Sequence, residues 1–284
     1  MTTKKAAPRA RSKGWKTLEV VDRDGVLLVG LNRPDVHNAF DETLIAELTS
    51  CIETAGGESS VRAIVLHGAG KSFCAGADLD WMRRMAGYGR AENLADANAL
   101  ARMLRTLAEC PKPTIARVHG PAYGGGVGLV ACCDVAIGAH DAVFALSEVK
   151  LGLIPATISP YVVAAIGERH ARRYFVTAER FDAGEAYRIG LLHELVTADA
   201  LDTRVNEVLG AMLLGGPRAQ SEAKTLVRAV ANRPVDDELV ADTAARIATV
   251  RAGAEAREGV GAFLERRPAA WIPPALRPAP KASH

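Results

Sequence analysis

The sequence predicts an α/β core over residues 15–200, followed by a helical region over residues 201–267. The first observation is a change of pattern along the chain. Strand-like and helix-like segments alternate as far as Val196, and helical segments alone follow. The second is composition, because 49% hydrophobic and 24% charged residues in a chain of 284 are typical of a globular protein with a sizeable core.

The chain begins with a predicted hairpin. Thr17–Val21 and Val26–Leu31 are apolar or alternating runs on either side of the turn sequence DRDG. After the loop NRPDVHNAF, Asp41 is expected to begin a helix, because the apolar residues that follow recur with helical spacing. The residues on this apolar face are Leu44, Ile45, Leu48 and Ile52.

The later elements follow from the same patterns and from residues that interrupt them, such as Pro111 and Pro113. Further strands are expected at Val61–Gly68, Thr114–Val118, Asp134–Ile137 and Leu192–Val196. Further helices are expected at Leu94–Cys110, Gly126–Cys133, Leu201–Leu214, Pro217–Ala231, Asp236–Val250 and Glu255–Glu265. Between Ser159 and the strand at Leu192, the chain is expected to be mostly helical.

Both ends of the chain are expected to be loose. Residues 1–14 form a basic tail without the apolar stretch of a secretory signal, and residues 268–284 are rich in proline. A net charge of +2 and the lack of an apolar run of about 18–20 residues argue against nucleic-acid and membrane partners. Five cysteines without CxxC spacing are expected to be free thiols, so these features indicate a cytoplasmic protein.

Two loops of small residues carry the first functional signal. SFCAGADL (residues 72–79) follows a predicted strand, and YGGGVGLVACCD (residues 123–134) leads into a predicted helix. Uncovered backbone N–H groups in such loops and at a helix N-terminus attract negative charge. Two such loops that converge on one carbonyl oxygen form an oxyanion hole, where the loss of one donor costs about 2.7–4 kcal/mol of barrier.

Glu148 is the candidate for moving a proton. It lies on an expected loop within FALSEVKLGLIP (residues 144–155), between apolar residues. A carboxylate that is shielded from water has a raised pKa, which suits general acid and base catalysis near neutral pH. For this residue taken alone, a surface or helix-capping carboxylate is the alternative interpretation.

Four motifs together resemble those of the crotonase family of enoyl-CoA hydratases and isomerases: NRPDVHNAF, KSFCAGADL, YGGGVGLVACCD and FALSEVKLGLIP, in that order. The likeness extends from Trp15 to Arg267, and the segment from Ser147 to Val196 is most similar to the methylglutaconyl-CoA hydratase branch. It implies a crotonase-like spiral of ββα units with a C-terminal helical trimerisation region, assembled as a homotrimer or as a hexamer of two trimers. It also implies an acyl-CoA substrate in fatty acid metabolism or leucine degradation, with no metal and no cofactor besides the CoA of the substrate.

The resemblance also implies roles for particular residues. The N–H groups of Ala77 and Gly125 hold the thioester oxygen, and Glu148 is the acid and base. The residues expected to contact CoA are Ala75, Asp78, Leu79 and Gly124, together with Phe263 and Arg266, which reach the CoA of a neighbouring subunit.

Gly128 stands where hydratases of this family usually carry a second glutamate. Glycine inside a helix costs about 1 kcal/mol relative to alanine, and close packing against a neighbouring element is one reason for it. Three functional interpretations stay open: Glu148 manages the water alone, the enzyme is a single-glutamate isomerase, or the substrate carries its own carboxylate. We expect an enoyl-CoA hydratase acting on an α,β-unsaturated acyl-CoA, branched or carboxylated as in methylglutaconyl-CoA, with the isomerase as the alternative.

Two other protein classes are remote alternatives. Gly126–Ala131 fits the GxGxxA fingerprint of an NAD oxidoreductase, but HGPAY separates it from the preceding strand. The basic tail is the basis for an RNA-binding role, but the first helix carries acids that would repel phosphate. The histidines show no ligand spacing, so no metal is expected, and for His119 a structural role is favoured over catalysis.

Overall fold

The computed structural model describes residues 9–10 and 14–277. These residues form two compact units: the first extends to Val205 without residues 111–113, and the second consists of residues 111–113 and the chain from Asn206. The division falls inside α7 (Leu201–Leu214), close to the boundary at residue 200 that the sequence predicts. Of the basic tail expected over residues 1–14, Arg9–Ala10 pair with the next strand as β1, whereas residues 1–8 and 11–13 lie outside the described residues.

The first unit is built on a sheet whose described strands follow the order β1-β2-β3-β4-β5-β7-β10. Neighbours from β1 to β3 pair antiparallel, and neighbours from β3 onward pair parallel. The strands are β1 (Arg9–Ala10), β2 (Leu18–Arg23), β3 (Val26–Leu31), β4 (Ala63–Gly68), β5 (Thr114–Val118), β7 (Val135–Ala139) and β10 (Glu194–Val196). Because parallel strands end at the same edge of a sheet, the loops after β3, β4 and β5 emerge together. These loops carry NRPDVHNAF, SFCAGADL and the triple glycine.

A small sheet of order β6-β8-β9 connects the glycine loop with the segment of Glu148. β6 (Ala122–Tyr123) pairs parallel with β8 (Val143–Ala145), and β8 pairs antiparallel with β9 (Phe181–Asp182). β6 leads into α4 (Gly125–Cys132), and β8 leads into the 3-10 helix η2 (Glu148–Leu151). Since the two strands are parallel neighbours, the starts of α4 and η2 lie side by side.

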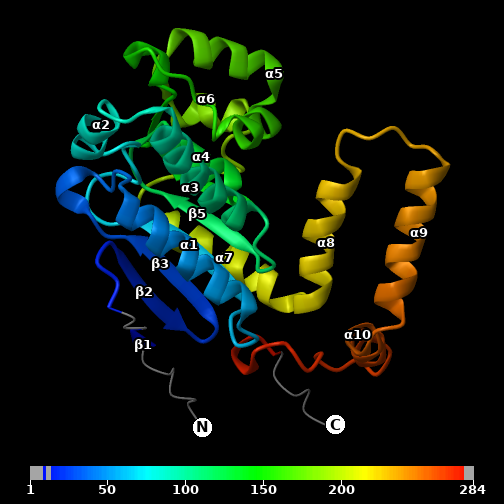
Figure 1. The fold of residues 1–284 in the computed structure, drawn as a ribbon. Coiled ribbons are helices and arrows are strands. Elements are labelled where there is room, and N and C mark those ends of the chain that lie inside the picture. The colour runs from blue at the N-terminus through cyan, green and yellow to red at the C-terminus, as the bar shows by residue number, and fades with distance from the viewer. Residues whose placement is uncertain (1–8, 11–13, 278–284) are drawn as a thin grey trace. The chain divides into compact units, whose positions relative to one another are not determined.

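Helices cover the main sheet. α1 (Glu42–Gly57) begins after Asp41, as predicted, because the Asp41 side chain accepts a hydrogen bond from the N–H of Leu44 at 2.8 Å. The predicted apolar face of α1 is buried, and α1 packs beside α3 (Arg90–Ala108), which also packs against α4 (Figure 1). The other helices of this unit are α2 (Leu79–Met85), α5 (Ser159–Thr177) and α6 (Ala183–Arg188).

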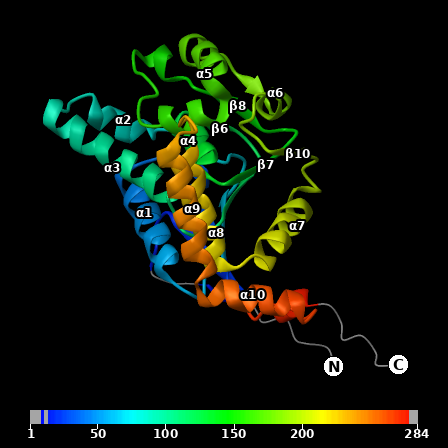
Figure 2. The same cartoon turned by 90° about the vertical axis from the view of Figure 1, so that its right-hand side faces the viewer.

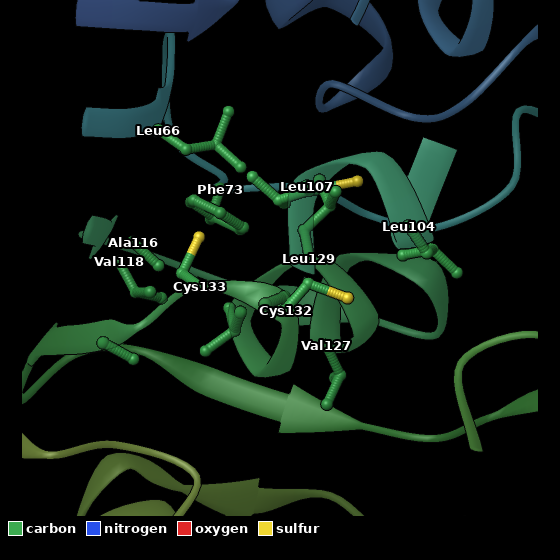
Figure 3. Packing of buried hydrophobic residues seen from close by; sticks show 14 of the residues in the cluster. Leu66, Phe73, Leu104, Leu107, Ala116, Val118, Val127, Leu129, Cys132 and Cys133 are labelled. Carbon is green, nitrogen blue, oxygen red and sulfur yellow. The ribbon is translucent and has the colours of Figure 1, made fainter. Parts of the chain in front are cut away.

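α4 is buried on every side, unlike the one-sided α1. Its buried residues include Val127, Leu129, Val130 and Cys132. Figure 3 shows Val127, Leu129 and Cys132 among side chains of other elements, such as Leu66, Phe73, Leu104 and Leu107. All five cysteines are buried thiols outside any disulfide, as the sequence predicts. A short helix in such surroundings has room only for small and apolar side chains, which explains its composition.

The second unit is helical, as predicted. It contains α8 (Pro217–Val230), α9 (Asp237–Arg251) and α10 (Ala254–Leu264), and α10 packs against both of the others (Figure 2). The Glu255 side chain accepts hydrogen bonds from the N–H groups of Arg218 and Ala219 at 3.0 and 2.8 Å. These bonds satisfy the first turn of α8, whose N–H groups have no partner within the helix.

The Pro-rich segment, expected to be loose over residues 268–284, is hydrogen-bonded where it is described. Trp271 Nε1 donates to the carbonyl oxygen of Leu214 at 3.0 Å, and the N–H of Ala270 donates to Glu258 at 2.8 Å. A 3-10 turn, η3 (Pro274–Leu276), follows. Trp271 explains the difference, because a large aromatic ring that packs on the protein also needs a hydrogen-bond partner for its N–H, despite the surrounding prolines. Residues 278–284 lie outside the described residues.

Candidate active site

The loop after β3 holds the loop after β4 in place. Asn38 is buried, and its Nδ2 donates to the carbonyl oxygens of Ala69 and Ser72, both at 2.8 Å. Its Oδ1 accepts from the N–H of Arg33 at 2.9 Å. One side-chain amide thus satisfies backbone groups of both loops that would otherwise be buried without partners.

An ion-pair cluster fixes the far end of the same loop. The Arg33 guanidinium contacts the carboxylates of Asp41 and Asp78 at 2.9 and 3.0 Å. Burial would raise the pKa of Asp78, but the N–H groups of Trp81 and Asp80 and the charge of Arg33 more than offset it, so this pKa is lowered. The Asp78 side chain therefore caps α2 and binds Arg33, while its carbonyl oxygen accepts from the N–H of Met82 at 2.8 Å.

The N–H of Ala77 points away from Phe40, its bridge partner. Phe40 and Ala77 form a parallel bridge, in which the Phe40 N–H donates to Gly76 at 2.6 Å and the Asp78 N–H donates to Phe40 at 2.9 Å. In a parallel bridge of this kind, Phe40 bonds to the residues on either side of Ala77. The N–H and C=O groups of Ala77 itself point away from Phe40. The Ala77 N–H accordingly has no hydrogen-bond partner among the described residues.

The loop after β4 touches the glycine loop through its backbone. Gly76 has a φ of 88°, and a Cβ on it would lie 3.0 Å from the carbonyl oxygen of Tyr123 and 3.9 Å from the Cα of Gly124. Glycine tolerates both this φ and this approach. The contact brings the loop of Ala77 against the loop of Gly125, whose N–H is unpaired because Gly125 is the first residue of α4.

Phe40 spans both loops. It is 1% exposed, and its bridge partner is Ala77. A Cβ on Gly125 would lie 2.5 Å from the Phe40 Cε2, so the ring packs directly on the glycine backbone. The Phe40 ring and backbone therefore hold the two unpaired N–H groups at a set spacing.

Glu148 lies over the glycine loop and begins η2, where the sequence suggested a loop. Its Oε1 is 3.1 Å from the position of a Cβ on Gly124, and its Oε2 is buried without a hydrogen-bond partner in the described part of the chain. Burial raises the pKa of Glu148, and a hydrogen bond from its own backbone N–H opposes this only in part. The structure thus brings together Glu148, Ala77 and Gly125, which the sequence selected as catalytic candidates.

Gly128 is closely packed. A Cβ on Gly128 would lie 2.9 Å from the Ile158 Cβ, closer still to the Ile158 Cγ2, and 3.4 Å from the Leu104 Cδ2. Close packing against a neighbouring element therefore explains the glycine at this position, because no side chain larger than glycine fits without movement.

The other residues that the sequence singled out do not form one cluster with Glu148. Ala75, in the loop after β4, donates its N–H to the carbonyl oxygen of His37 in the loop after β3 at 3.0 Å, and Leu79 is exposed at the start of α2. Phe263 and Arg266 belong to the second unit, where Phe263 is 81% exposed at the end of α10. His119 contacts the carbonyl oxygen of Gly70 through Nε2 at 2.9 Å, in keeping with a structural role.

Sequence reasoning assigned no role to Arg33, Asn38, Phe40 and Ile158. The first three belong to NRPDVHNAF, and the position of this motif ahead of the other three was the feature that could have pointed to them. No sequence pattern indicated Ile158, because its contact is with Gly128, which lies thirty residues earlier in the chain.

The remote alternatives do not fit this geometry. The fingerprint glycines of Gly126–Ala131 lie inside α4 and are covered, Gly126 by Cys74 and Gly128 by Ile158, so their backbone is closed to a dinucleotide. The tail residues behind the RNA-binding alternative lie outside the described residues except for Arg9. Among the described residues, no three His, Cys, Asp or Glu side chains form a group that could hold a metal ion. No described helix is both long enough and apolar enough to span a membrane.

The order of strands and the ββα connections define an α/β protein of the crotonase fold. Residues 22–273 match the family model described as enoyl-CoA hydratase/isomerase, and the chain belongs to this family.

Named relatives agree with this assignment. The chain is 36% identical over 259 residues to enoyl-CoA hydratase ACTT6 of Alternaria alternata, covering 89% of this chain and 82% of that protein. It is 30% identical over 257 residues to crotonyl-CoA hydratase of Syntrophomonas wolfei, covering 90% and 96%. Among solved structures, it is similar to an enoyl-CoA hydratase from Shewanella pealeana, with a TM-score of 0.88, 43% identity and coverage of 90% and 96%.

Proposed function

We propose that this protein adds water to, or removes it from, an α,β-unsaturated acyl-CoA. The observation that carries the proposal is the meeting of two unpaired N–H groups, from Ala77 and Gly125, with the buried carboxylate of Glu148. Relatives named as hydratases support water addition as the reaction.

In this mechanism the thioester oxygen accepts hydrogen bonds from the N–H groups of Ala77 and Gly125. Glu148 removes a proton from water as the water oxygen bonds to the β-carbon, and the electron pair of the double bond moves toward the thioester oxygen. The two N–H groups stabilise the resulting enolate. Glu148 then returns the proton to the α-carbon, so that water is added overall and the carboxylate is regenerated; removal of water follows the reverse path.

The environment of Glu148 suits this double task. Its Oε2 is buried and has no partner in the described structure, so it is free to take a proton. Its raised pKa brings the acid and base forms closer together in energy near neutral pH. Both features follow from its position at the start of η2, against the glycine loop.

A second candidate is an isomerase that shifts the double bond of an enoyl-CoA. Gly128 favours it, because the place of a second carboxylate is filled by Ile158. One carboxylate is sufficient for this reaction: Glu148 removes a proton from one carbon and returns it two carbons along, without water. The same N–H pair stabilises the dienolate between these steps.

For the substrate, we propose a branched or carboxylated acyl group such as methylglutaconyl, whose CoA lies along Ala75, Asp78, Leu79 and Gly124. CoA arrives as part of the substrate, and the reaction needs no metal or other cofactor. We also propose a homotrimer or a hexamer, in which Phe263 and Arg266 reach a neighbour's CoA. Support comes from apolar side chains that the second unit leaves exposed, including Val227, Val260, Phe263 and Leu264.

A panel of saturated, trans-2, trans-3 and carboxylated acyl-CoAs tests these proposals. Water addition is followed separately from double-bond migration, for the native enzyme and for Glu148→Gln. The hydratase proposal expects water addition to trans-2 substrates that disappears in the variant. Migration without water addition would replace it with the isomerase, and no reaction with any thioester would overturn both.

A further inference from the structure

α4 has two bare positions that are one turn apart. Gly124 precedes its first residue, Gly128 lies four residues further on, and the Gly128 N–H donates to the Gly124 carbonyl oxygen at 3.3 Å. Glu148 lies over the first position, with Oε1 3.1 Å from the place of a Cβ on Gly124. Ile158 lies over the second, in van der Waals contact with Gly128. Glu148 and Ile158 therefore occupy successive positions along one helix.

One continuous segment connects these two residues. It begins with η2, where the N–H of Leu153 donates to the Glu148 carbonyl oxygen at 3.1 Å, and it ends at Ile158, just before α5. Glu148 and Ile158 are thus the two ends of one segment anchored on α4.

Ile158 leaves no room beside Gly128. It is 2% exposed, and Leu104 of α3 approaches the same position from another side. Isoleucine is branched at Cβ and has few rotamers into which it can move. A carboxylate side chain at position 128 would need the space that Ile158 holds, so Gly128 and Ile158 fit each other.

Ile158 also determines which kind of group lies one turn along α4 from the position that Glu148 contacts. A glutamate at position 128 would present a charged, hydrogen-bonding group one turn from the Glu148 carboxylate. Isoleucine presents methyl groups, which neither bind water nor donate to the unpartnered Oε2 of Glu148.

We propose that Ile158 is a specificity-determining residue: by filling the space over Gly128, it excludes a second carboxylate and commits the site to chemistry that Glu148 performs alone. This inference rests on the proposed function, because it takes Glu148 as the acid and base of an acyl-CoA reaction. It holds for water addition and for double-bond migration alike.

The first test measures whether the two residues share one space. Thermal unfolding is followed for Gly128→Ala, Ile158→Ala and the double variant. Gly128→Ala is expected to lower Tm by roughly 5 °C through overpacking, and Ile158→Ala to lower it through a cavity. The double variant is expected to unfold at a higher temperature than the summed losses give. Additive losses would overturn the proposal, since they would mean that the side chains do not compete.

The second test restores a carboxylate once room has been made. Gly128→Glu is combined with Ile158→Ala, and the matched control combines Gly128→Gln with Ile158→Ala, so that the pair differs only in charge. The Glu variant is expected to add water to crotonyl-CoA at least about tenfold faster than the Gln variant, in the range of general acid–base contributions. Gly128→Glu alone is expected to unfold at a lower temperature and to gain no activity.

Equal rates for the matched pair would overturn the role of Ile158, and so would a Gly128→Glu variant that keeps the native Tm and hydrates faster. If the double variants with Glu or Gln do not fold, the unfolding temperatures of the alanine variants still test whether Gly128 and Ile158 share one space. Failure of the proposed function looks different: native enzyme would then act on no enoyl-CoA, while the unfolding cycle would still report on the packing of Ile158.

Discussion

The two halves of the glycine stretch contain the same residue for different physical reasons. At Gly124 and Gly125, glycine lets the backbone approach the Glu148 carboxylate and the Phe40 ring, and the first N–H of α4 stays without a partner in the helix. At Gly126 and Gly128, glycine lets α4 pack against other elements, Cys74 in one case and Ile158 in the other. The comparison teaches that glycines within one motif need separate explanations, and that a substitution should affect chemistry in the first half and packing in the second.

The largest expected effect comes from the carboxylate that faces the first half. Glu148→Gln keeps the shape of the side chain and removes its ability to accept a proton. We expect kcat to fall by about 10²–10⁴-fold with the fold intact, which steady-state kinetics and circular dichroism measure together. A decrease in kcat of less than about tenfold would show that Glu148 is not the acid and base. It would also contradict the functional explanation for Gly124 and Gly125.

Gly125→Ala is expected to have the next largest effect. Its Cβ would collide with the Phe40 ring, 2.5 Å away, and displace the N–H that we propose binds the thioester oxygen. We expect kcat to fall by about 100-fold, as on loss of an oxyanion donor. Combining it with Phe40→Leu, which makes room for the methyl group, should recover part of kcat. A Gly125→Ala enzyme with native kcat would contradict the assignment.

Gly126→Ala sharpens the comparison from the packing side. A Cβ there would lie 3.0 Å from the Cys74 Cβ and closer still to its carbonyl oxygen, which is backbone and cannot move aside. We expect the free energy of unfolding to fall by about 1–3 kcal/mol, measured by chemical denaturation. The kcat per folded enzyme should stay near the native value. A loss of kcat without a loss of stability would mean that Gly126, like Gly124 and Gly125, serves the chemistry.

The smallest expected effect is a pH dependence of stability. Because burial raises the pKa of Glu148 above its ordinary value of 4.5, the folded protein holds this proton more tightly than the unfolded chain. The resulting stability is present below pH 4.5 and is lost as the pH rises through the folded pKa. The Tm of Glu148→Gln minus that of the native protein should therefore grow as the pH rises from 4.5, and then level off. A difference that shrinks with rising pH would contradict a raised pKa.

The fold was predictable where a pattern is repeated over several residues. β3, β5 and α7 have the predicted bounds, and α1 begins one residue after Asp41, where the sequence predicts its start. β6, β8 and β9 were missed, because strands of two or three residues are too short to show alternation. α2 was missed for the related reason that its seven residues follow a loop and bury only Trp81 among them.

The site was predictable in part. Glu148, Ala77 and Gly125 were selected from sequence and lie together, because their loops follow neighbouring strands or lead from paired ones. Asn38, Phe40 and Ile158 act through contacts between distant segments, and such contacts leave no spacing in the sequence. The same limitation explains why the close packing of Gly128 could be named as an alternative but not chosen.

The most direct measurement of the central claim is a crystal structure of the protein with a saturated acyl-CoA, which offers the thioester oxygen but no double bond. The claim predicts this oxygen about 2.7–3.1 Å from the backbone nitrogens of both Ala77 and Gly125, with the Glu148 carboxylate facing the α- and β-carbons. A thioester oxygen bound to neither nitrogen, or an acyl chain on the far side of α4 from Glu148, would contradict it.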